Sequence, residues 1–291
     1  MISIILTAYK EPKTIGKAVE QILMNKLDNY ELIVDAPDKE TLDAVKKYAK
    51  KNKHIRLIQD PGNGKPSALN LAFKKARGNV LVLTDGDVYV GENSINFLLE
   101  RLEKSGAFAV TGRPVAQESR ESLFGYWAHF LLNAANEDRI KRLKESKPIL
   151  LSGYLFAMKK GIKNIPADVL DDAFISGTIW KNNQKIDYEP RAEVFIKNPS
   201  NFTDWLKQKR RNTSSFAKIK EYLPQAEDTR SFFSEVKGVY KVFLYPRNIK
   251  EFFYSILLLF ARLLAWILGF WDTKVKKKEF KEIWQRIDST K

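Results

Sequence analysis

Hydrophobic runs and amphipathic segments alternate along the first 88 residues of the chain. Strand patterns occupy Ile2–Thr7, Glu31–Asp35, Ile55–Gln59 and Val80–Thr84. In the last of them Val80–Leu83 is apolar without a break, which is typical of a strand buried on both faces. Helical patterns occupy Thr14–Asn25, Asp38–Lys51 and Pro66–Ala76, with Asp38 as a helix N-cap. This alternation predicts right-handed crossovers and a Rossmann-like parallel sheet, whose strands end at one edge.

The middle of the chain, residues 93–196, contains both helix and strand patterns. The pattern predicts a helix, a strand, a long helical stretch rich in aromatic residues, a second helix and two short strands. These lie, in order, at Asn93–Ser105, Phe108–Gly112, Ser119–Glu145, Asp168–Lys181, and Ile186–Pro190 with Ala192–Ile196. The aromatic stripe is more typical of a packing surface than of a ligand site.

A twenty-residue apolar segment, Phe252–Trp271, carries a single charge at Arg262. Its length suits a membrane span, but a mid-membrane arginine costs about 2.5–3.5 kcal/mol. The basic tail from Lys274 would also face outward, against the positive-inside preference. We therefore expect a helix in the membrane interface, with a helix packed inside the protein as the alternative. The expected domains are 1–222, catalytic, and 223–291, helical and membrane-interfacial.

Composition narrows the class of partner. The chain has 291 residues, a net charge of +15, no cysteine and two histidines. Disulfide frameworks and thiolate metal sites are excluded. The positive charge favours phosphate-rich partners, namely nucleic acid, an anionic membrane surface or nucleotide diphosphates. The N-terminus begins directly with a strand pattern and has no signal-peptide pattern, so the expected location of the catalytic part is cytoplasmic.

Two strand-end loops carry candidate chemistry. Asp85 and Asp87 follow the fourth strand and are separated by Gly86, which leaves room for a ligand. Paired carboxylates suit a divalent cation that also binds substrate phosphates. The loop Gly62–Lys65 precedes a helix N-terminus, which favours anions. Ordinary turns with a solvated lysine are the alternative for both loops.

Taken together, these motifs resemble those of the family 2 glycosyltransferases. The resemblance rests on Thr7–Glu11, Asp35, Gly64–Asn70 and Asp85–Asp87, and its order and spacing extend over roughly the first 210 residues. It implies the GT-A fold, a mostly parallel sheet flanked by helices, a nucleotide-diphosphate sugar as donor, and Mg²⁺ or Mn²⁺. The chain departs at its second motif, where Ala36, Pro37 and Asp38 follow Asp35 in place of the usual Gly-Ser.

The resemblance also implies roles on the donor side. The base and ribose would be held by Thr7, Ala8, Tyr9, Glu11 and Asp35. Lys65 would lie beside the nucleotide, Asp85 and Gly86 near the ribose and diphosphate, and Asp87 with Asp85 on the metal.

On the acceptor side, Gly153 would let the backbone approach the sugar. Asp171 and Asp172 match an acidic pair whose second member is the catalytic base, although a first helical turn favours carboxylates anyway. Gln208 and Arg211 match the Gln-x-x-Arg-Trp motif, with Gln208 on the acceptor side and Arg211 on the diphosphate. Asn212 stands at the tryptophan position, which argues against a processive polymerase.

The leading interpretation is an inverting, metal-dependent transferase at the cytoplasmic face of the cell membrane, peripheral or monotopic. It would move one sugar to a lipid-linked or membrane-proximal acceptor. A polyprenyl-phosphate sugar synthase is the nearest alternative, and a catalytically inactive sugar-binding module is another. A nucleic-acid-binding protein would explain the charge but not the acidic strand ends, so no nucleic acid partner is expected.

Overall fold

The computed structural model describes residues 1–211, 238–272 and 287–290, and these form two compact units. Unit 1 comprises Met1–Val115 and Arg139–Ile196. Unit 2 comprises Ala116–Asp138 and the described part of Lys197–Lys291. The predicted boundary between residues 222 and 223 lies outside the described residues, as does Asn212.

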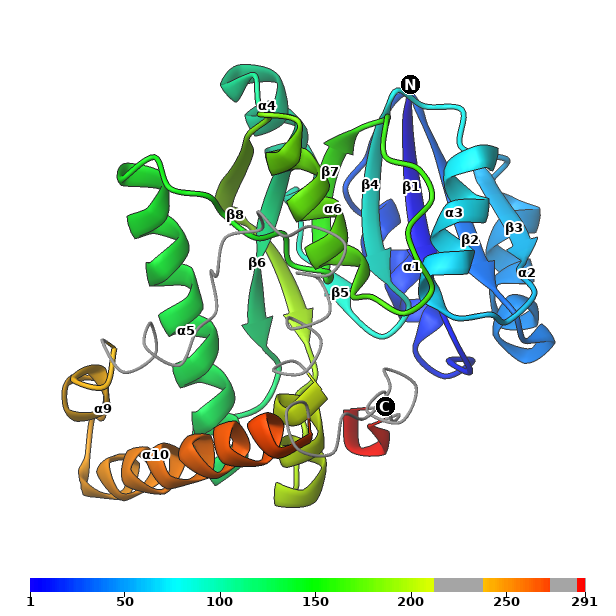
Figure 1. The fold of residues 1–291 in the computed structure, drawn as a ribbon. Helices are drawn as coiled ribbons and strands as arrows, with labels where there is room; N and C mark the ends of the chain where they lie inside the picture. Colours follow the sequence, from blue (N-terminus) through cyan, green and yellow to red (C-terminus); the bar gives the residue numbers. More distant parts are fainter. Residues whose placement is uncertain (212–237, 273–286, 291) are drawn as a thin grey trace. The chain divides into compact units, whose positions relative to one another are not determined.

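Unit 1 is built on an eight-stranded sheet in the order β3-β2-β1-β4-β7-β6-β8-β5 (Figure 1). The strands are β1 (Ile2–Thr7), β2 (Tyr30–Ala36), β3 (Ile55–Gln59), β4 (Val80–Asp85), β5 (Tyr89–Val90), β6 (Ala109–Ala116), β7 (Leu155–Lys159) and β8 (Ile186–Ile196). The four strands predicted at the N-terminus are present, and β1, β2, β3 and β4 are mutually parallel as expected.

The other half of the sheet corrects the prediction of a mostly parallel sheet. Strand β7 is antiparallel to both β4 and β6, and β5 is antiparallel to β8, so the sheet is mixed. Neither β5 nor β7 was predicted. Strand β8 runs without a break through Pro190, where two short strands were expected.

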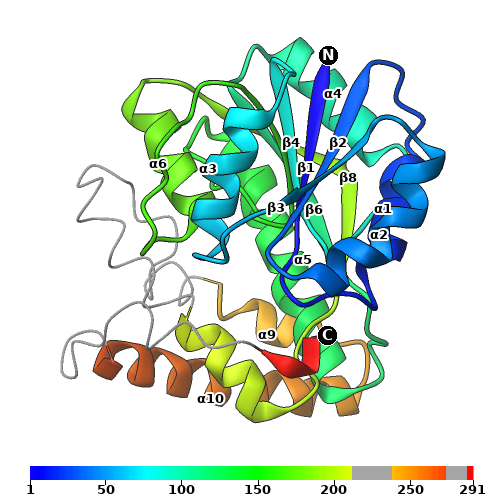
Figure 2. The same ribbon diagram turned by 90° about the vertical axis from the view of Figure 1, so that its right-hand side faces the viewer.

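Helices cover both faces of this sheet (Figure 2). Helices α3 (Lys65–Lys75) and α6 (Asp171–Lys181) lie on one face, and α1 (Ile15–Leu23), α2 (Lys39–Lys51) and α4 (Ser94–Ser105) lie on the other. Asp38 caps α2 as predicted, since its carboxylate accepts a hydrogen bond from Thr41 N. Helix α6 begins at Asp171, three residues after the predicted start at Asp168.

The apolar side chains of each strand point alternately to the two faces of the sheet, so the hydrophobic core is divided between these faces. Ile5 and Leu83 pack in one cluster with Phe73 of α3 and Ile175 of α6. Because successive side chains of a strand point to opposite faces, their equally buried neighbours, such as Ile4, serve the α1 and α2 layer. The doubly covered strands therefore form a rigid support for the loops at their ends.

Unit 2 contains the first part of α5 (Leu123–Lys144), the helical residues 202–211, α9 (Lys241–Leu244), α10 (Ile249–Phe270) and the 3₁₀ turn Asp288–Thr290. The predicted aromatic stripe is its core, as Tyr126 and Trp127 of α5 pack with Trp205 and Leu258. Tyr126 Oη lies 2.6 Å from Ser255 Oγ, and Trp127 Nε1 donates to Tyr254 O at 2.8 Å.

Helix α10 buries only one narrow stripe, made by Glu251, Ser255, Leu258, Ala261, Ala265 and Gly269. Ser255 and Gly269 lie in this stripe, and Arg262 is half-buried. The rest of the helix exposes large apolar side chains, among them Phe253, Leu257 and Phe260. By length and composition alone, α10 could cross a membrane.

Candidate active site

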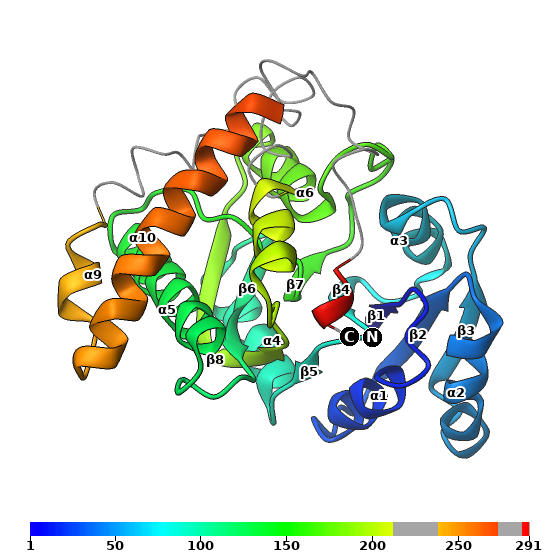
Figure 3. The same ribbon diagram turned by 90° about the horizontal axis from the view of Figure 1, so that it is seen from below.

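The register of three parallel strands brings the predicted donor-side residues to one edge of the sheet. Thr7 of β1 lies level with Asp35 of β2 and Asp85 of β4. Thr7 Oγ1 donates to Asp85 Oδ1 at 3.0 Å, and Gly86 N donates to Thr7 O at 2.8 Å. Ala8 N donates to Asp35 O at 3.0 Å. Figure 3 is viewed from the side on which these strands end.

Gly86 is required by the close packing of the two loops. A Cβ atom at this position would lie 2.6 Å from Glu11 Oε2 and 2.7 Å from Ala8 Cβ. Any larger residue would push the loop after β1 away from the loop after β4. Glu11 is buried and its N–H donates to Thr41 Oγ1 at 2.8 Å, which fixes the first loop from the other side.

Asp35 is fully buried, and neither carboxyl oxygen has a hydrogen-bond partner among the described residues. Burial, with the nearby negative charge of Asp60, raises the pKa of Asp35 to about 7. A buried carboxyl without a partner is costly unless a ligand supplies one. Its position at the end of β2 therefore suits a hydrogen bond to a bound nucleotide.

Lys65 joins the donor edge to the acidic helix start. It is the first residue of α3 and follows Gly64, whose φ of 93° favours glycine. Its Nζ lies 2.7 Å from Asp85 Oδ1 and 3.4 Å from Asp171 Oδ2. One ammonium group therefore bridges carboxylates from β4 and α6.

Charge and burial act against each other in this cluster. Burial raises the pKa of Asp85 and Asp171 above the usual range, although the positive charge of Lys65 opposes the rise. Burial also disfavours the charged form of Lys65, but the negative charges of Asp171, Asp85 and Asp172 outweigh it and raise the lysine pKa. The ammonium form of Lys65 is therefore stabilised.

Asp172 is held beside Gly153. Gly153 N donates to Asp172 Oδ2 at 3.1 Å, and Ala173 N donates to Asp172 Oδ1 at 2.8 Å. A Cβ on residue 153 would lie 3.3 Å from Asp172 Oδ2, so glycine allows this close approach. Asp172 is half-buried, and each of its oxygens keeps lone-pair capacity for a proton.

The remaining predicted residues lie in the loops after β1 and β4 or in unit 2, and the negative charge of Asp87 helps to raise the pKa of Asp85. Tyr9 is 52% exposed at the end of β1, and Asp87 is half-buried after β4. Gln208 and Arg211 belong to the helical residues 202–211 of unit 2. Gln208 is buried and its Oε1 accepts from Lys209 Nζ at 3.4 Å.

Sequence reasoning missed the residues that support the site. Asp60 directly follows β3 and lies near Asp35, and it was detectable as a carboxylate after a strand. Thr111 Oγ1 accepts from Ser152 N at 2.9 Å, and Ser176 Oγ accepts from Leu151 N at 3.0 Å, which fixes the segment before Gly153. No sequence signal marks these two hydroxyl groups, because their partners are distant in the chain.

Asp85 and Asp87 fit a divalent cation only in part. Asp85 Oδ1 is engaged by Thr7 and Lys65, which leaves Oδ2 as its further ligand atom. Among the described residues, no group of three or more acidic, histidine or cysteine side chains could hold a metal. A cation that binds one or two carboxylates and completes its shell with diphosphate oxygens fits this donor set.

Comparison with known proteins agrees with this geometry. The profile of Glycosyl transferase family 2 matches residues 3–165, more than half of the chain. EpsJ of Bacillus subtilis (strain 168), an uncharacterized glycosyltransferase, is 30% identical over 36% of this chain and 31% of its own length. Glycosyltransferase AglD of Haloferax volcanii is 34% identical over 38% and 19%. Glycosyltransferase GlyG of Streptococcus pneumoniae is 23% identical over 44% and 43%.

These alignments cover less than half of this chain and less than half of each relative. The profile match includes the strand-edge residues and Gly153 and ends before Asp171 and Asp172. The family as a whole acts on nucleotide-sugar donors, for which the edge of the sheet is suited. The chain belongs to glycosyl transferase family 2.

Proposed function

We propose that this glycosyltransferase moves a single sugar from a nucleotide-diphosphate sugar to a lipid-linked or membrane-proximal acceptor, with inversion at the anomeric carbon. The observation that carries the proposal is the contact of Lys65 with both Asp85 and Asp171. This contact joins the strand edge, suited to a donor, to the helix start that holds the candidate base. The donor-side residues and the candidate base are thus built into one cluster of unit 1.

The donor would lie along the edge formed by β1, β2 and β4. Two residues suit the base and ribose of the donor. The buried carboxyl of Asp35 would form a hydrogen bond with them, and the exposed ring of Tyr9 would stack on them. The N-terminus of α3 and the ammonium group of Lys65 favour the diphosphate, because both present positive charge. Arg211 is proposed as a further diphosphate ligand.

Asp87 and Oδ2 of Asp85 would hold Mg²⁺ or Mn²⁺ together with the diphosphate. When bound, the cation would neutralise the charge that develops on the leaving diphosphate. The Lys65 ammonium group, which contacts the Asp85 carboxylate, would add a fixed positive charge and so also stabilise the leaving diphosphate.

Asp172 is proposed as the general base. Its carboxylate would take the proton of the acceptor hydroxyl as that oxygen bonds to the anomeric carbon and the bond to the diphosphate breaks. Attack from the face opposite the leaving group inverts the configuration. The backbone N–H groups of Gly153 and Ala173 orient the carboxylate, while Lys65 holds the neighbouring Asp171.

Unit 2 supports the proposal of a lipid-linked or membrane-proximal acceptor. Outside its single buried stripe, helix α10 exposes a broad apolar surface. An apolar surface of this kind is typical of a helix that lies in the membrane interface. Attachment to the cytoplasmic face would place the enzyme where a soluble nucleotide donor and a lipid-linked acceptor meet.

The assignment of the base is tested with Asp172→Asn. Donor affinity, measured by calorimetry, should stay nearly unchanged, while turnover should fall by about 10²–10⁴-fold, the usual contribution of a positioned base. Asp168→Asn is the matched control, because Asp168 is a nearby carboxylate that precedes the helix start at Asp171. A collapse of donor affinity in Asp172→Asn would make this residue a donor-site group. Surviving turnover would indicate an acceptor that is already ionised.

A further inference from the structure

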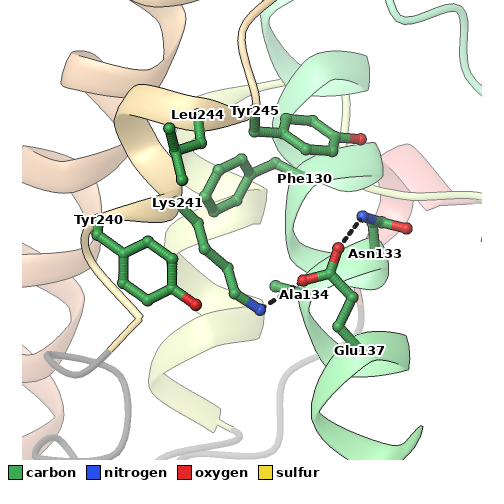
Figure 4. Close-up of a pocket in the computed structure, with 8 residues that line it drawn as sticks. All are labelled: Phe130, Asn133, Ala134, Glu137, Tyr240, Lys241, Leu244 and Tyr245. Atoms are coloured by element: carbon green, nitrogen blue, oxygen red, sulfur yellow. Dashed lines mark hydrogen bonds and ion pairs between the residues drawn. The ribbon is translucent and has the colours of Figure 1, made fainter.

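Unit 2 contains a surface cavity of about 200 Å³ between α5 and α9. Phe130, Asn133 and Glu137 line it from α5. Tyr240 and Tyr245 line it from the two ends of α9, with Lys241 between them. Figure 4 shows the polar ends of Asn133, Glu137 and Lys241 along one side and the three rings along the other.

The volume limits the size of the ligand. Pockets for drug-sized molecules measure roughly 300–1,000 Å³, so this cavity of about 200 Å³ is too small for a nucleotide sugar. A water molecule takes roughly 30 Å³ of liquid volume. The space therefore suits a single six-membered ring with its substituents.

The charges within the cavity balance. Lys241 Nζ lies 2.5 Å from Glu137 Oε2, and Glu137 Oε1 accepts from Asn133 Nδ2 at 2.9 Å. Since the ammonium charge is compensated, a phosphate or carboxylate gains little from entering. Lys241 has further N–H donors, and the amide of Asn133 has both a donor and an acceptor, so a neutral hydroxylated ligand can be bound at several points.

The rings complete a surface for a sugar. Phe130, Tyr240 and Tyr245 line the cavity. Tyr240, at 57% exposed, offers the accessible ring face, while the buried Phe130 packs edge to face against Tyr245 behind it. A pyranose ring has an apolar C–H face and polar hydroxyl edges. An aromatic wall opposite a polar row matches both, as in small-molecule sites that combine apolar walls with a few placed polar groups.

The cavity borders the exposed apolar surface of unit 2. Leu244 lines the cavity and is itself 75% exposed. Adjacent in sequence are the exposed Phe243 and, at the start of α10, Ile249 and Phe253. A ligand whose polar ring enters the cavity could therefore leave an apolar part on the same surface. This combination of ring and apolar tail is that of a glycolipid.

We propose that this cavity binds the neutral, single-sugar headgroup of a membrane glycolipid. The site would be separate from the transfer site, since none of its lining residues belongs to the strand-edge cluster. This proposal rests on the proposed function, in which the protein attaches to a membrane, and it names one class of lipid to which the protein would attach. Binding at this cavity would add sugar specificity to an otherwise apolar attachment.

The experiment compares sedimentation of the full chain with two kinds of vesicle. One contains phosphatidylcholine and phosphatidylglycerol, and the other contains in addition monoglucosyldiacylglycerol. The glycolipid should strengthen binding about tenfold, which is the worth of one to two net hydrogen bonds. Asn133→Ala should abolish this gain and leave binding to the plain vesicles unchanged. Glu137→Ala should also abolish the gain, but it frees the Lys241 ammonium group and should therefore strengthen binding to both kinds of vesicle equally.

Asp138→Ala is the matched control, because Asp138 is exposed, adjacent to Glu137 and absent from the cavity lining. It should keep the full gain. A second arm measures saturation transfer by NMR from the full chain to methyl glucoside without vesicles. A signal that Glu137→Ala removes would support the cavity even if vesicle binding fails.

Two results would overturn the proposal. One is equal binding to both vesicles together with no saturation transfer, which would leave the membrane attachment itself intact. The other is a glycolipid gain that Glu137→Ala and Asn133→Ala retain in full, since the headgroup would then bind elsewhere.

Discussion

Different forces stabilise the strand-edge cluster within unit 1 and the layer of α5 and α10 within unit 2, called here the helix layer. In the cluster, one lysine bridges two carboxylates and backbone N–H groups fix a third. In the helix layer, aromatic rings of α5 pack on the small residues of α10, and a few hydrogen bonds, such as that from Trp127 Nε1 to Tyr254 O, support this apolar packing. Polar contacts define positions to within a few tenths of an ångström, whereas the apolar layer defines mainly which surface is covered.

This difference indicates a division of labour. The cluster contains partly compensated charge that a donor and its cation can complete, as the orphan carboxyl of Asp35 shows most clearly. The helix layer instead leaves apolar surface outside its single buried stripe. The first arrangement is suited to chemistry and the second to attachment.

The largest effect is expected at Lys65. Lys65→Met would leave Asp85 and Asp171 without their shared counter-charge. Because Lys65 and Asp85 are only half-buried, the cost should stay below the roughly 3–5 kcal/mol of breaking a fully buried pair. Turnover should fall by roughly 10²–10³-fold, comparable to the loss of one electrostatic stabiliser, and urea unfolding should show the lost stability. Lys74→Met on the exposed side of the same helix is the control. Equal activity in the two variants would remove Lys65 from the site.

A second test compares two buried carboxylates whose pKa values shift in opposite directions. Asp35 in unit 1 has a pKa of about 7 in the folded protein, against a usual value of 3.8. Between these values the unfolded chain loses the proton first, so stability falls as pH rises, by up to roughly 4 kcal/mol above pH 7. Asp35→Asn should therefore stabilise the protein at pH 8 and have little effect at pH 4.

Glu251 in unit 2 should behave in the opposite way. Its hydrogen bonds with Arg120 lower its pKa below 4.5, so its stabilisation is present above that pH and is lost as the pH falls through the folded value. Glu251→Gln should destabilise the protein at pH 8. Urea unfolding between pH 4 and pH 8 measures both effects, and parallel pH profiles for the two variants would contradict the comparison.

A smaller effect is expected on the surface of α10. Leu257→Gln with Phe260→Gln, at positions 50% and 64% exposed, should weaken binding to anionic liposomes about 10²-fold, because each side chain contributes roughly 1.5 kcal/mol or more when buried. Nucleotide binding should not change. The control, Lys46→Gln with Lys47→Gln on α2, removes two exposed charges and keeps the apolar surface. A larger loss in the control would indicate electrostatic attachment.

The parallel half of the sheet was predictable because its strands are short, mainly apolar segments separated by amphipathic helices. Strand β7 was missed since Leu155–Lys159 is short and follows a loop, and strand direction leaves no periodic signal. The break expected at Pro190 did not occur, because a proline lacks only its own ladder donor and β8 continues on either side of it.

The site was predictable where chemistry follows a strand end, as at Asp85 and Asp35. The bridge from Lys65 to Asp171 was not, because it joins residues from distant parts of the chain whose approach depends on how α3 and α6 share one face of the sheet. The pairing of Asp35 with Asp60 likewise depends on the neighbouring positions of β2 and β3. Local patterns carry no information about either contact.

The central claim is that the strand edge binds a nucleotide diphosphate together with a divalent cation. Titration calorimetry of the full chain with uridine and guanosine diphosphates, with Mn²⁺ or with a chelator, tests it most directly. Mn²⁺ should strengthen binding of at least one nucleotide, and Asp87→Ala should remove that gain. The control is Glu103→Ala, at an exposed position on α4, which should keep it. Equal affinity with metal and with chelator, or no binding of either nucleotide, would contradict the account.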